Sequence, residues 1–182
     1  GVHLYEHGII SFANQLALDT GVKAGMSVKE ASHLMLEENL AQASASEITN
    51  RTVMETSPDG RHVIATDSIA FGTSEDTGNN VLVTAGHTGR SAVPYLLKTM
   101  PWGFICSDGG RGMDDSGIAG MYMVEEQGLA GATVDATKAR MGSGLSHYYD
   151  GIISAVNNGA LNRGVEIGMP ASAAAKLLLS KM

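Results

Sequence analysis

Val81-Leu82-Val83-Thr84-Ala85 is a short apolar run bounded by polar residues, and the sequence around it repeats that pattern. Similar strand-like runs lie at 62–71, 103–107 and 129–134. Helical patterns lie between or after them, at 91–100, 116–127 and 151–162. Short apolar strands that alternate with helices are typical of a parallel sheet covered on both faces. The sequence therefore predicts an α/β fold with a largely parallel sheet covered by helices on both faces.

Length and charge limit the classes of function. A chain of 182 residues with 43% hydrophobic residues suits one globular domain, here 1–182. A net charge of −7 argues against nucleic acid and anionic membrane surfaces as partners. Cys106 is the one cysteine, so no internal disulfide forms and a reducing compartment fits. No apolar run is long enough to span a membrane, so we expect a cytoplasmic protein.

An internal repeat links the two ends of the chain. Residues 5–39 and 148–182 are identical at 15 of 35 positions, at a constant offset of 143. Each copy carries Gly-Ile-Ile-Ser, a shared Asn and a Gly-Met turn, and we predict two helices in each copy. The first ends near Gly21 or Gly164, since glycine commonly follows a helix. The second begins at Ser27 or Pro170, and Ser27 with Glu30 has the spacing of a capping box.

The repeat divides the predicted domain into a helix pair at 1–43, a sheet core at 51–147 and a second helix pair at 148–182. We predict that 44–59 and 72–80 are loops. The two pairs could pack together as one pseudo-symmetric layer, or the chain could be the remaining part of a duplicated gene. The shared polar residues could line a joint or a dimer interface: Tyr5 and Tyr148, Ser11 and Ser154, Asn14 and Asn157.

Three polar loops follow predicted strands, where α/β sheets bind ligands. The first holds His87, Thr88, Gly89 and Arg90. Free N–H groups at a helix start, with Thr88 and Arg90, would suit an anion, and His87 could transfer a proton. The loop lacks both the Walker A and the Gly-x-Gly-x-x-Gly patterns, so no nucleotide cofactor is predicted. A tight turn with a surface histidine is the structural alternative.

The second loop is the richest in functional groups. Arg111 could bind a carboxylate, and its glycines would let a ligand approach the backbone. Asp108, Asp114 and Asp115 could bind Mg²⁺, and Asp108 or Asp115 could act as a base. The predicted substrate-binding residues here are Ser107, Gly109, Gly110 and Arg111. Helix capping and a tied turn would explain one or two of these residues. Cys106 could be a nucleophile or part of the core.

The third loop follows the last predicted strand. It supplies Asp135, Lys138, Arg140 and His147. Asp135 and Arg140 are predicted to bind substrate, and the alternative is a solvated connection. Asp67, within a strand-like run, could also point into the same cleft.

The order of strand, helix and Gly-rich loop resembles the RraA-like fold of class II pyruvate aldolases over about 55 residues. That family holds an oxo-acid and Mg²⁺ with an adjacent Arg-Asp pair, whereas here Arg111 is separated from Asp114. The repeated helix pairs are foreign to that fold. The Gly-His-x-Gly and Asp-x-Gly-x-Gly-x-Asp patterns are also similar to those of an uncharacterised bacterial α/β family.

Three hypotheses follow. The first is an enzyme, a lyase, hydrolase or isomerase, that acts on a small carboxylate- or phosphate-bearing metabolite, with Mg²⁺ as a candidate cofactor. In it His87, Asp108 and Asp115 are catalytic, and three arginines hold the anion. The second is a metabolite-binding or regulatory module without catalysis. The third is a structural subunit of a larger assembly. A homo-oligomer is expected under all three.

Overall fold

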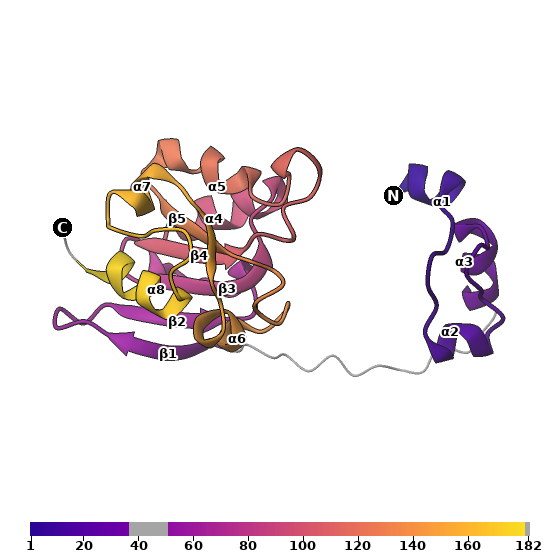
Figure 1. Ribbon diagram of the computed structural model, residues 1–182, viewed down its shortest axis with the longest axis horizontal. Coiled ribbons are helices and arrows are strands. Elements are labelled where there is room, and N and C mark those ends of the chain that lie inside the picture. Colours follow the sequence, from indigo (N-terminus) through magenta and orange to yellow (C-terminus); the bar gives the residue numbers. More distant parts are fainter. Residues whose placement is uncertain (37–50, 181–182) are drawn as a thin grey trace. The chain divides into compact units, whose positions relative to one another are not determined.

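The computed structural model describes residues 1–36 and 51–180. Contacts divide the chain into two compact units, Gly1–Glu47 and Ile48–Met182. Figure 1 labels helices and strands of the two units. The predictions for 37–50 and 181–182 concern residues outside the described ranges.

The larger unit is built on one six-stranded sheet whose strands lie in sequence order. The strands are β1 (Arg51–Thr56), β2 (His62–Thr66), β3 (Val81–His87), β4 (Gly103–Ser107), β5 (Ala130–Val134) and β6 (Ile153–Val156). Neighbours from β2 to β5 pair in parallel, while β1 and β6 pair antiparallel at the two edges. The α/β prediction is confirmed, with a mixed sheet.

Short helices connect and cover these strands (Figure 1). The α-helices of this unit are α4 (Val93–Thr99), α5 (Ala119–Met123), α6 (Gly144–Tyr149), α7 (Asn158–Leu161) and α8 (Ala171–Leu179). The 3₁₀ turns are η1 (Ile69–Phe71), η2 (Ser74–Asp76), η3 (Arg90–Ala92), η4 (Met113–Asp115) and η5 (Glu125–Gln127).

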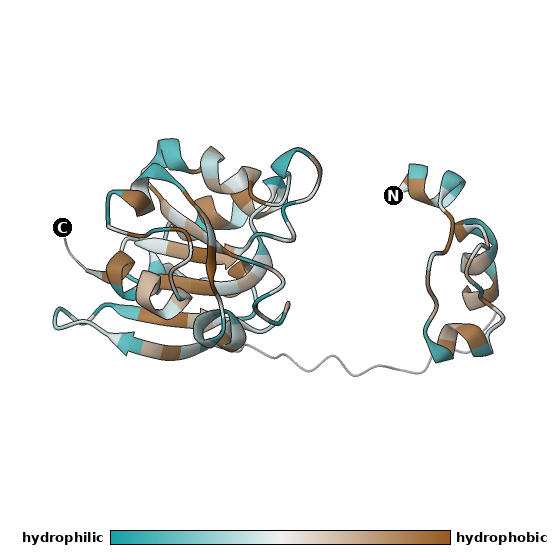
Figure 2. Cartoon of the chain, viewed as in Figure 1, coloured by the Kyte–Doolittle hydropathy of each residue, from teal (hydrophilic) through white to brown (hydrophobic). Residues whose placement is uncertain are grey.

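Alternate residues of the strands belong to two hydrophobic clusters, as a two-residue period requires. Ile105 packs in the cluster that includes Leu178 of α8. Its neighbour Phe104 packs with Leu96 of α4 and Met121 of α5. Figure 2 shows this hydrophobic colour on the central strands. The core therefore fixes the sheet and leaves the loops at its carboxyl edge to carry polar groups.

The smaller unit holds α1 (Val2–His7), α2 (Gln15–Asp19) and α3 (Val28–Leu36). Ser27 and Glu30 exchange capping hydrogen bonds at the start of α3, which confirms the predicted capping box. Within this unit only Val22 and Ala31 of the described residues are buried apolar side chains.

The prediction of a helix over 151–162 is wrong. Residues 153–156 form β6, and only 158–161 are helical. The helical spacing misled because Ile153 and Ala155 face the core from a strand instead. The open edge of β5 offers backbone partners there, and tertiary pairing overrides a weak local preference. The first helix predicted in the N-terminal copy is likewise interrupted, because 8–14 are not helical.

Two other boundaries differ from the predictions. β1 lies within the stretch 44–59 that was predicted to be a loop, and β2 ends at Thr66 rather than at residue 71. The loop 72–80 is anchored by Asp76, which is buried and receives hydrogen bonds from Arg51, Thr73 and Asn80. These ties hold the pKa of Asp76 below its ordinary value against the opposing effect of burial.

Candidate functional site

The loops after β2, β3, β4 and β5 meet at the carboxyl edge of the parallel strands. The Thr88 amide and hydroxyl both donate to the Ser107 carbonyl, at 3.2 and 3.1 Å. The Asp108 carboxylate accepts from the Ala136 amide at 3.0 Å. The Asp67 carboxylate accepts from the Gly144 amide at 2.9 Å. Backbone and side-chain bonds therefore bring the predicted loops together.

His87 is exposed at the end of β3 and its ring is held by its own loop. Its Nδ1 accepts a hydrogen bond from the Gly89 amide at 3.0 Å. A neutral imidazole that accepts at Nδ1 carries its proton on Nε2. The structure therefore favours His87 as a hydrogen-bond donor through Nε2.

Two glycines are required beside this histidine. A Cβ on Gly109 would lie 2.8 Å from the His87 Cβ, and one on Gly89 would lie 2.9 Å from Nδ1. Neither distance is tolerated between real atoms, so any larger residue would displace the ring or the loop. Gly109 therefore lets His87 lie against the β4 loop, and ligand binding at these glycines stays a prediction.

The backbone from Gly109 to Asp115 is unusual. Arg111, Asp114 and Asp115 have φ angles of 63°, 54° and 54°, which L-residues rarely adopt. Gly109, Gly110 and Gly112 also have positive φ. Each left-handed non-glycine residue costs of order 1 kcal/mol and persists where surrounding contacts hold it. Such backbone geometry is common in ligand-binding loops.

Arg111 is paired with its own loop. Its Nε donates to the Asp115 carboxylate at 2.8 Å, and both side chains are exposed. This bond raises the pKa of Arg111 and lowers the pKa of Asp115. A lowered pKa makes Asp115 a weaker base, so the geometry supports it as the partner that orients Arg111. The terminal nitrogens of Arg111 remain for an anion.

Arg90 and Arg140 are exposed and form no ion pair with any residue in 1–36 or 51–180. Asp135 accepts from the Thr137 amide and hydroxyl, which lowers its pKa. Ser107 is buried and accepts from the Gly109 amide at 3.1 Å. Asp135 and Ser107 thus hold turns in place, while Arg90 and Arg140 present charge to solvent.

Asp108 is buried and its Oδ1 accepts from two amides, those of Gly110 and Ala136. Asp114 and Asp115 are exposed. Among the described residues no three His, Cys, Asp or Glu side chains come together as a metal site. The three aspartates do not form a Mg²⁺ site as they stand, and Mg²⁺ binding stays a prediction.

Cys106 and His147 are both buried near this edge. Burial raises the pKa of the Cys106 thiol to about 11, so the thiolate nucleophile is disfavoured. His147 Nδ1 lies 3.0 Å from the Ser143 carbonyl, and its buried Nε2 has no hydrogen-bond partner among the described residues. Burial lowers the pKa of His147, which favours the neutral ring.

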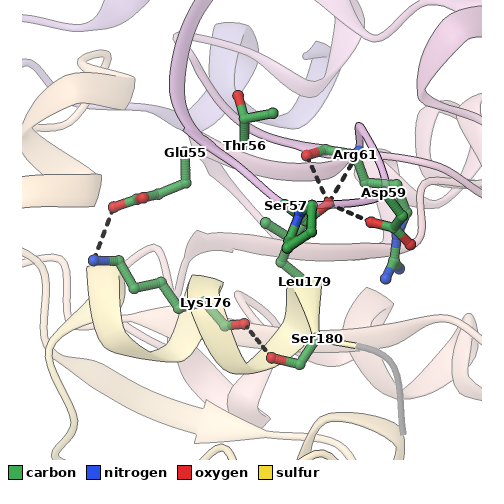
Figure 3. A pocket seen from close by; sticks show the side chains of 9 residues that line it. Glu55, Thr56, Ser57, Asp59, Arg61, Lys176, Leu179 and Ser180 are labelled. Atoms are coloured by element: carbon green, nitrogen blue, oxygen red, sulfur yellow. Dashed lines mark hydrogen bonds and ion pairs between the residues drawn. The ribbon is translucent and has the colours of Figure 1, made fainter.

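A separate hollow of about 460 Å³ lies at the opposite end of the sheet (Figure 3). It lies between the β1–β2 turn and the end of α8. Its charged groups neutralise one another, with Lys176 2.8 Å from Glu55 and Arg61 3.1 Å from Asp59. This hollow was not predicted, because the residues of β1 were predicted to form a loop. Both of its cations are paired, whereas the carboxyl edge also holds Arg90 and Arg140, which form no ion pair among the described residues.

No protein-family model, no curated protein and no solved structure matches this chain. The two family resemblances therefore stay predictions. In the described residues, no helix is both long and apolar enough to cross a membrane.

Proposed function

We propose that the chain is an enzyme that acts on a small carboxylate- or phosphate-bearing metabolite at the carboxyl edge of its sheet. The observation that carries the proposal is His87. Its imidazole accepts a hydrogen bond from the Gly89 amide, and its Cβ packs against Gly109, beside a glycine-rich loop with left-handed backbone. A fixed ring with its proton on Nε2 is suited to stabilise negative charge that develops on a substrate oxygen.

Arginines would supply the binding of the substrate anion. Arg111 is held by Asp115 in a fixed orientation, which reduces the side-chain entropy lost when it binds a carboxylate or phosphate. Arg90 follows His87 in the same turn, and Arg140 lies in the loop after β5. Arg90 and Arg140 are exposed, so both guanidinium groups could reach an anion bound beside Arg111.

Buried Asp108 would position the site rather than react. It joins the β4 loop to the β5 loop through Gly110 and Ala136. The reaction would then be one in which a carbonyl or phosphoryl oxygen gains charge, which includes lyase, isomerase and hydrolase chemistry.

A non-catalytic metabolite-binding module is the second candidate, because the arginines alone would bind an anion. Both candidates require that the chain bind a small anion, and a thermal-shift screen tests this first. The probes are inorganic phosphate, pyruvate, oxaloacetate and Mg²⁺, each tested on wild type, Arg111→Ala and Arg61→Ala. A ligand at ~100 times its Kd stabilises the folded state by about 2.7 kcal/mol.

We expect at least one anion to stabilise the wild type and Arg61→Ala but not Arg111→Ala. No shift with any anion would contradict the binding site. Turnover of the anion that binds then decides between the candidates. Loss of turnover in His87→Gln with binding intact supports the enzyme, and binding without turnover in the wild type supports the module.

A further inference from the structure

The two copies of the repeat have the same local structure. At the offset of 143, α1 corresponds to α6, α2 to α7 and α3 to α8. The isolated bridge between Ile9 and Ser27 corresponds to that between Ile152 and Pro170. The repeat thus extends from the sequence to the order of the three helices, while β6 has no strand counterpart at 10–13.

Hydrogen bonds agree as closely. The Ile10 amide donates to the Met26 carbonyl at 2.8 Å, and the Ile153 amide donates to the Met169 carbonyl at 2.9 Å. Gly25 and Gly168 share a left-handed φ, 87° and 91°. Asn14 caps α2 through the Ala17 amide as Asn157 caps α7 through the Ala160 amide, both at 3.0 Å.

The two copies differ in whether a β-sheet pairs with them. In the C-terminal copy, β6 adds to β5, and Asn157 donates to the Leu129 carbonyl and accepts from the Gly131 amide. In the N-terminal unit, 10–13 pair with no strand among the described residues of that unit. Asn14 retains only the capping bond there.

Apolar side chains show the same difference. Met35 is 50% exposed within its unit, whereas its counterpart Leu178 is fully buried against the sheet. Leu36 is 75% exposed and its counterpart Leu179 is 6% exposed. Figure 2 shows the hydrophobic colour on α2 of the small unit. The small unit therefore carries the apolar side chains that pack on the sheet in the copy at 144–179. No sheet is present among the described residues of the small unit.

We propose that residues 1–36 are a docking segment that completes a second β-sheet domain built like residues 51–143. Residues 10–13 would add antiparallel to the strand equivalent to β5. Asn14 would bond to that strand as Asn157 does, and α3 would pack on the sheet as α8 does. The partner is a polypeptide related to residues 51–143 whose own edge at this strand is open.

Two residues indicate that the partner is not the sheet of this same sequence. Phe12 corresponds in the repeat to Ala155, which is 3% exposed and packed in a hydrophobic cluster. Leu16 corresponds to Gly159. Even a single added Cβ on Gly159 would lie 3.1 Å from the Ala130 Cα, so a leucine side chain would not fit there. Both side chains would overpack this chain's sheet, so the partner has smaller residues opposite them.

The test grafts the segment onto the sheet that the chain contains. Residues 144–179 of the full-length chain are replaced by a second copy of residues 1–36, with and without Phe12→Ala and Leu16→Gly in the graft. Urea unfolding is followed through the fluorescence of Trp102, the one tryptophan. Two further versions of the adjusted graft carry Ile10→Asp, whose counterpart is buried, or Leu18→Asp, whose counterpart Leu161 is 50% exposed.

We expect the adjusted graft to unfold cooperatively, with a urea midpoint about 1 M above that of the unadjusted graft, because overpacking is relieved. Leu18→Asp should leave that transition in place and Ile10→Asp should remove it. Absence of a cooperative transition in the adjusted graft would overturn the docking role, since the wild-type chain provides the folded reference.

Two other outcomes would overturn the choice of partner. One is an unadjusted graft as stable as the wild type, which would make this sequence's own sheet a fitting partner. The other is a wild-type dimer in light scattering that Phe12→Asp dissociates, which would make a second copy of the chain the occupant. These results do not depend on the anion site.

Discussion

Replacing Asn157 with alanine should unfold the sheet unit at a markedly lower urea concentration. The side chain of Asn157 is buried, bonds to the β5 region and to α7, and makes a longer bond of 3.4 Å to the Met121 carbonyl of α5. Its amide nitrogen donates to the Leu129 carbonyl at 2.8 Å, and its oxygen accepts from the Gly131 and Ala160 amides at 2.9 and 3.0 Å. Alanine would leave two backbone groups at β5 buried without partners and would remove the cap of α7.

The magnitude follows from those three bonds. Each buried backbone group left without a partner costs about 1 to 2 kcal/mol, and a lost cap costs about 1 kcal/mol. The sum is roughly 3 to 5 kcal/mol of unfolding free energy. At an m value of about 2 kcal/mol/M, the urea midpoint falls by roughly 2 M. Trp102 fluorescence reports this transition, because the indole packs against the same cluster as α8.

Asn158→Ala and Asn14→Ala are the matched controls. Asn158 is the exposed neighbour, and Asn14 makes the same cap without the two bonds to a sheet. Both should shift the midpoint by less than about 0.5 M. The reasoning would be refuted if Asn157→Ala changed the midpoint no more than Asn158→Ala does.

Three further predictions concern the carboxyl edge. The pKa of His147 is lowered from 6.5 by burial, so its contribution to stability is full above about pH 6.5 and is lost as the pH falls below it. Chemical unfolding at about pH 7.5 and about pH 5 should therefore show a larger loss in the wild type than in His147→Leu; equal losses would refute it. Cys106, with a pKa of about 11, should react with a disulfide reagent at about pH 8 only after unfolding, and rapid native labelling would be the contrary result. Gly109→Ala should perturb the His87 ring resonances strongly, whereas Gly110→Ala, with the same sign of φ but open space, should not. Equal effects of the two substitutions would place the cause in backbone strain rather than in contact with His87.

Strands β3, β4 and β5 could be predicted because each is a short apolar run followed by polar turn residues. Their runs contain enough buried side chains to mark a strand without tertiary information. β6 could not, because Ile152, Ile153 and Asn157 have helical spacing and become extended only beside β5. The prediction also missed β1, because its exposed and half-buried side chains do not alternate as a strand with one buried face would.

The candidate site was predictable as a set of loops but not as a set of roles. The position after each strand placed His87, Asp108 and Asp135 at one edge. Sequence alone could not show that the Asp108 carboxylate would accept hydrogen bonds from the Gly110 and Ala136 amides, or that Arg111 would pair with Asp115. Those outcomes depend on the positive φ angles of residues 109–112, 114 and 115, which depend on the packed loops around them.

The most direct test of the proposed site is an NMR titration of the ¹⁵N-labelled chain with inorganic phosphate and with oxaloacetate. We expect saturable shifts in residues 86–91, 107–117 and 135–143, together with the His87 ring nitrogens. We also expect Arg111→Ala to abolish these shifts. An absence of shifts at this edge, or shifts confined to the hollow lined by Glu55, Arg61 and Lys176, would contradict it.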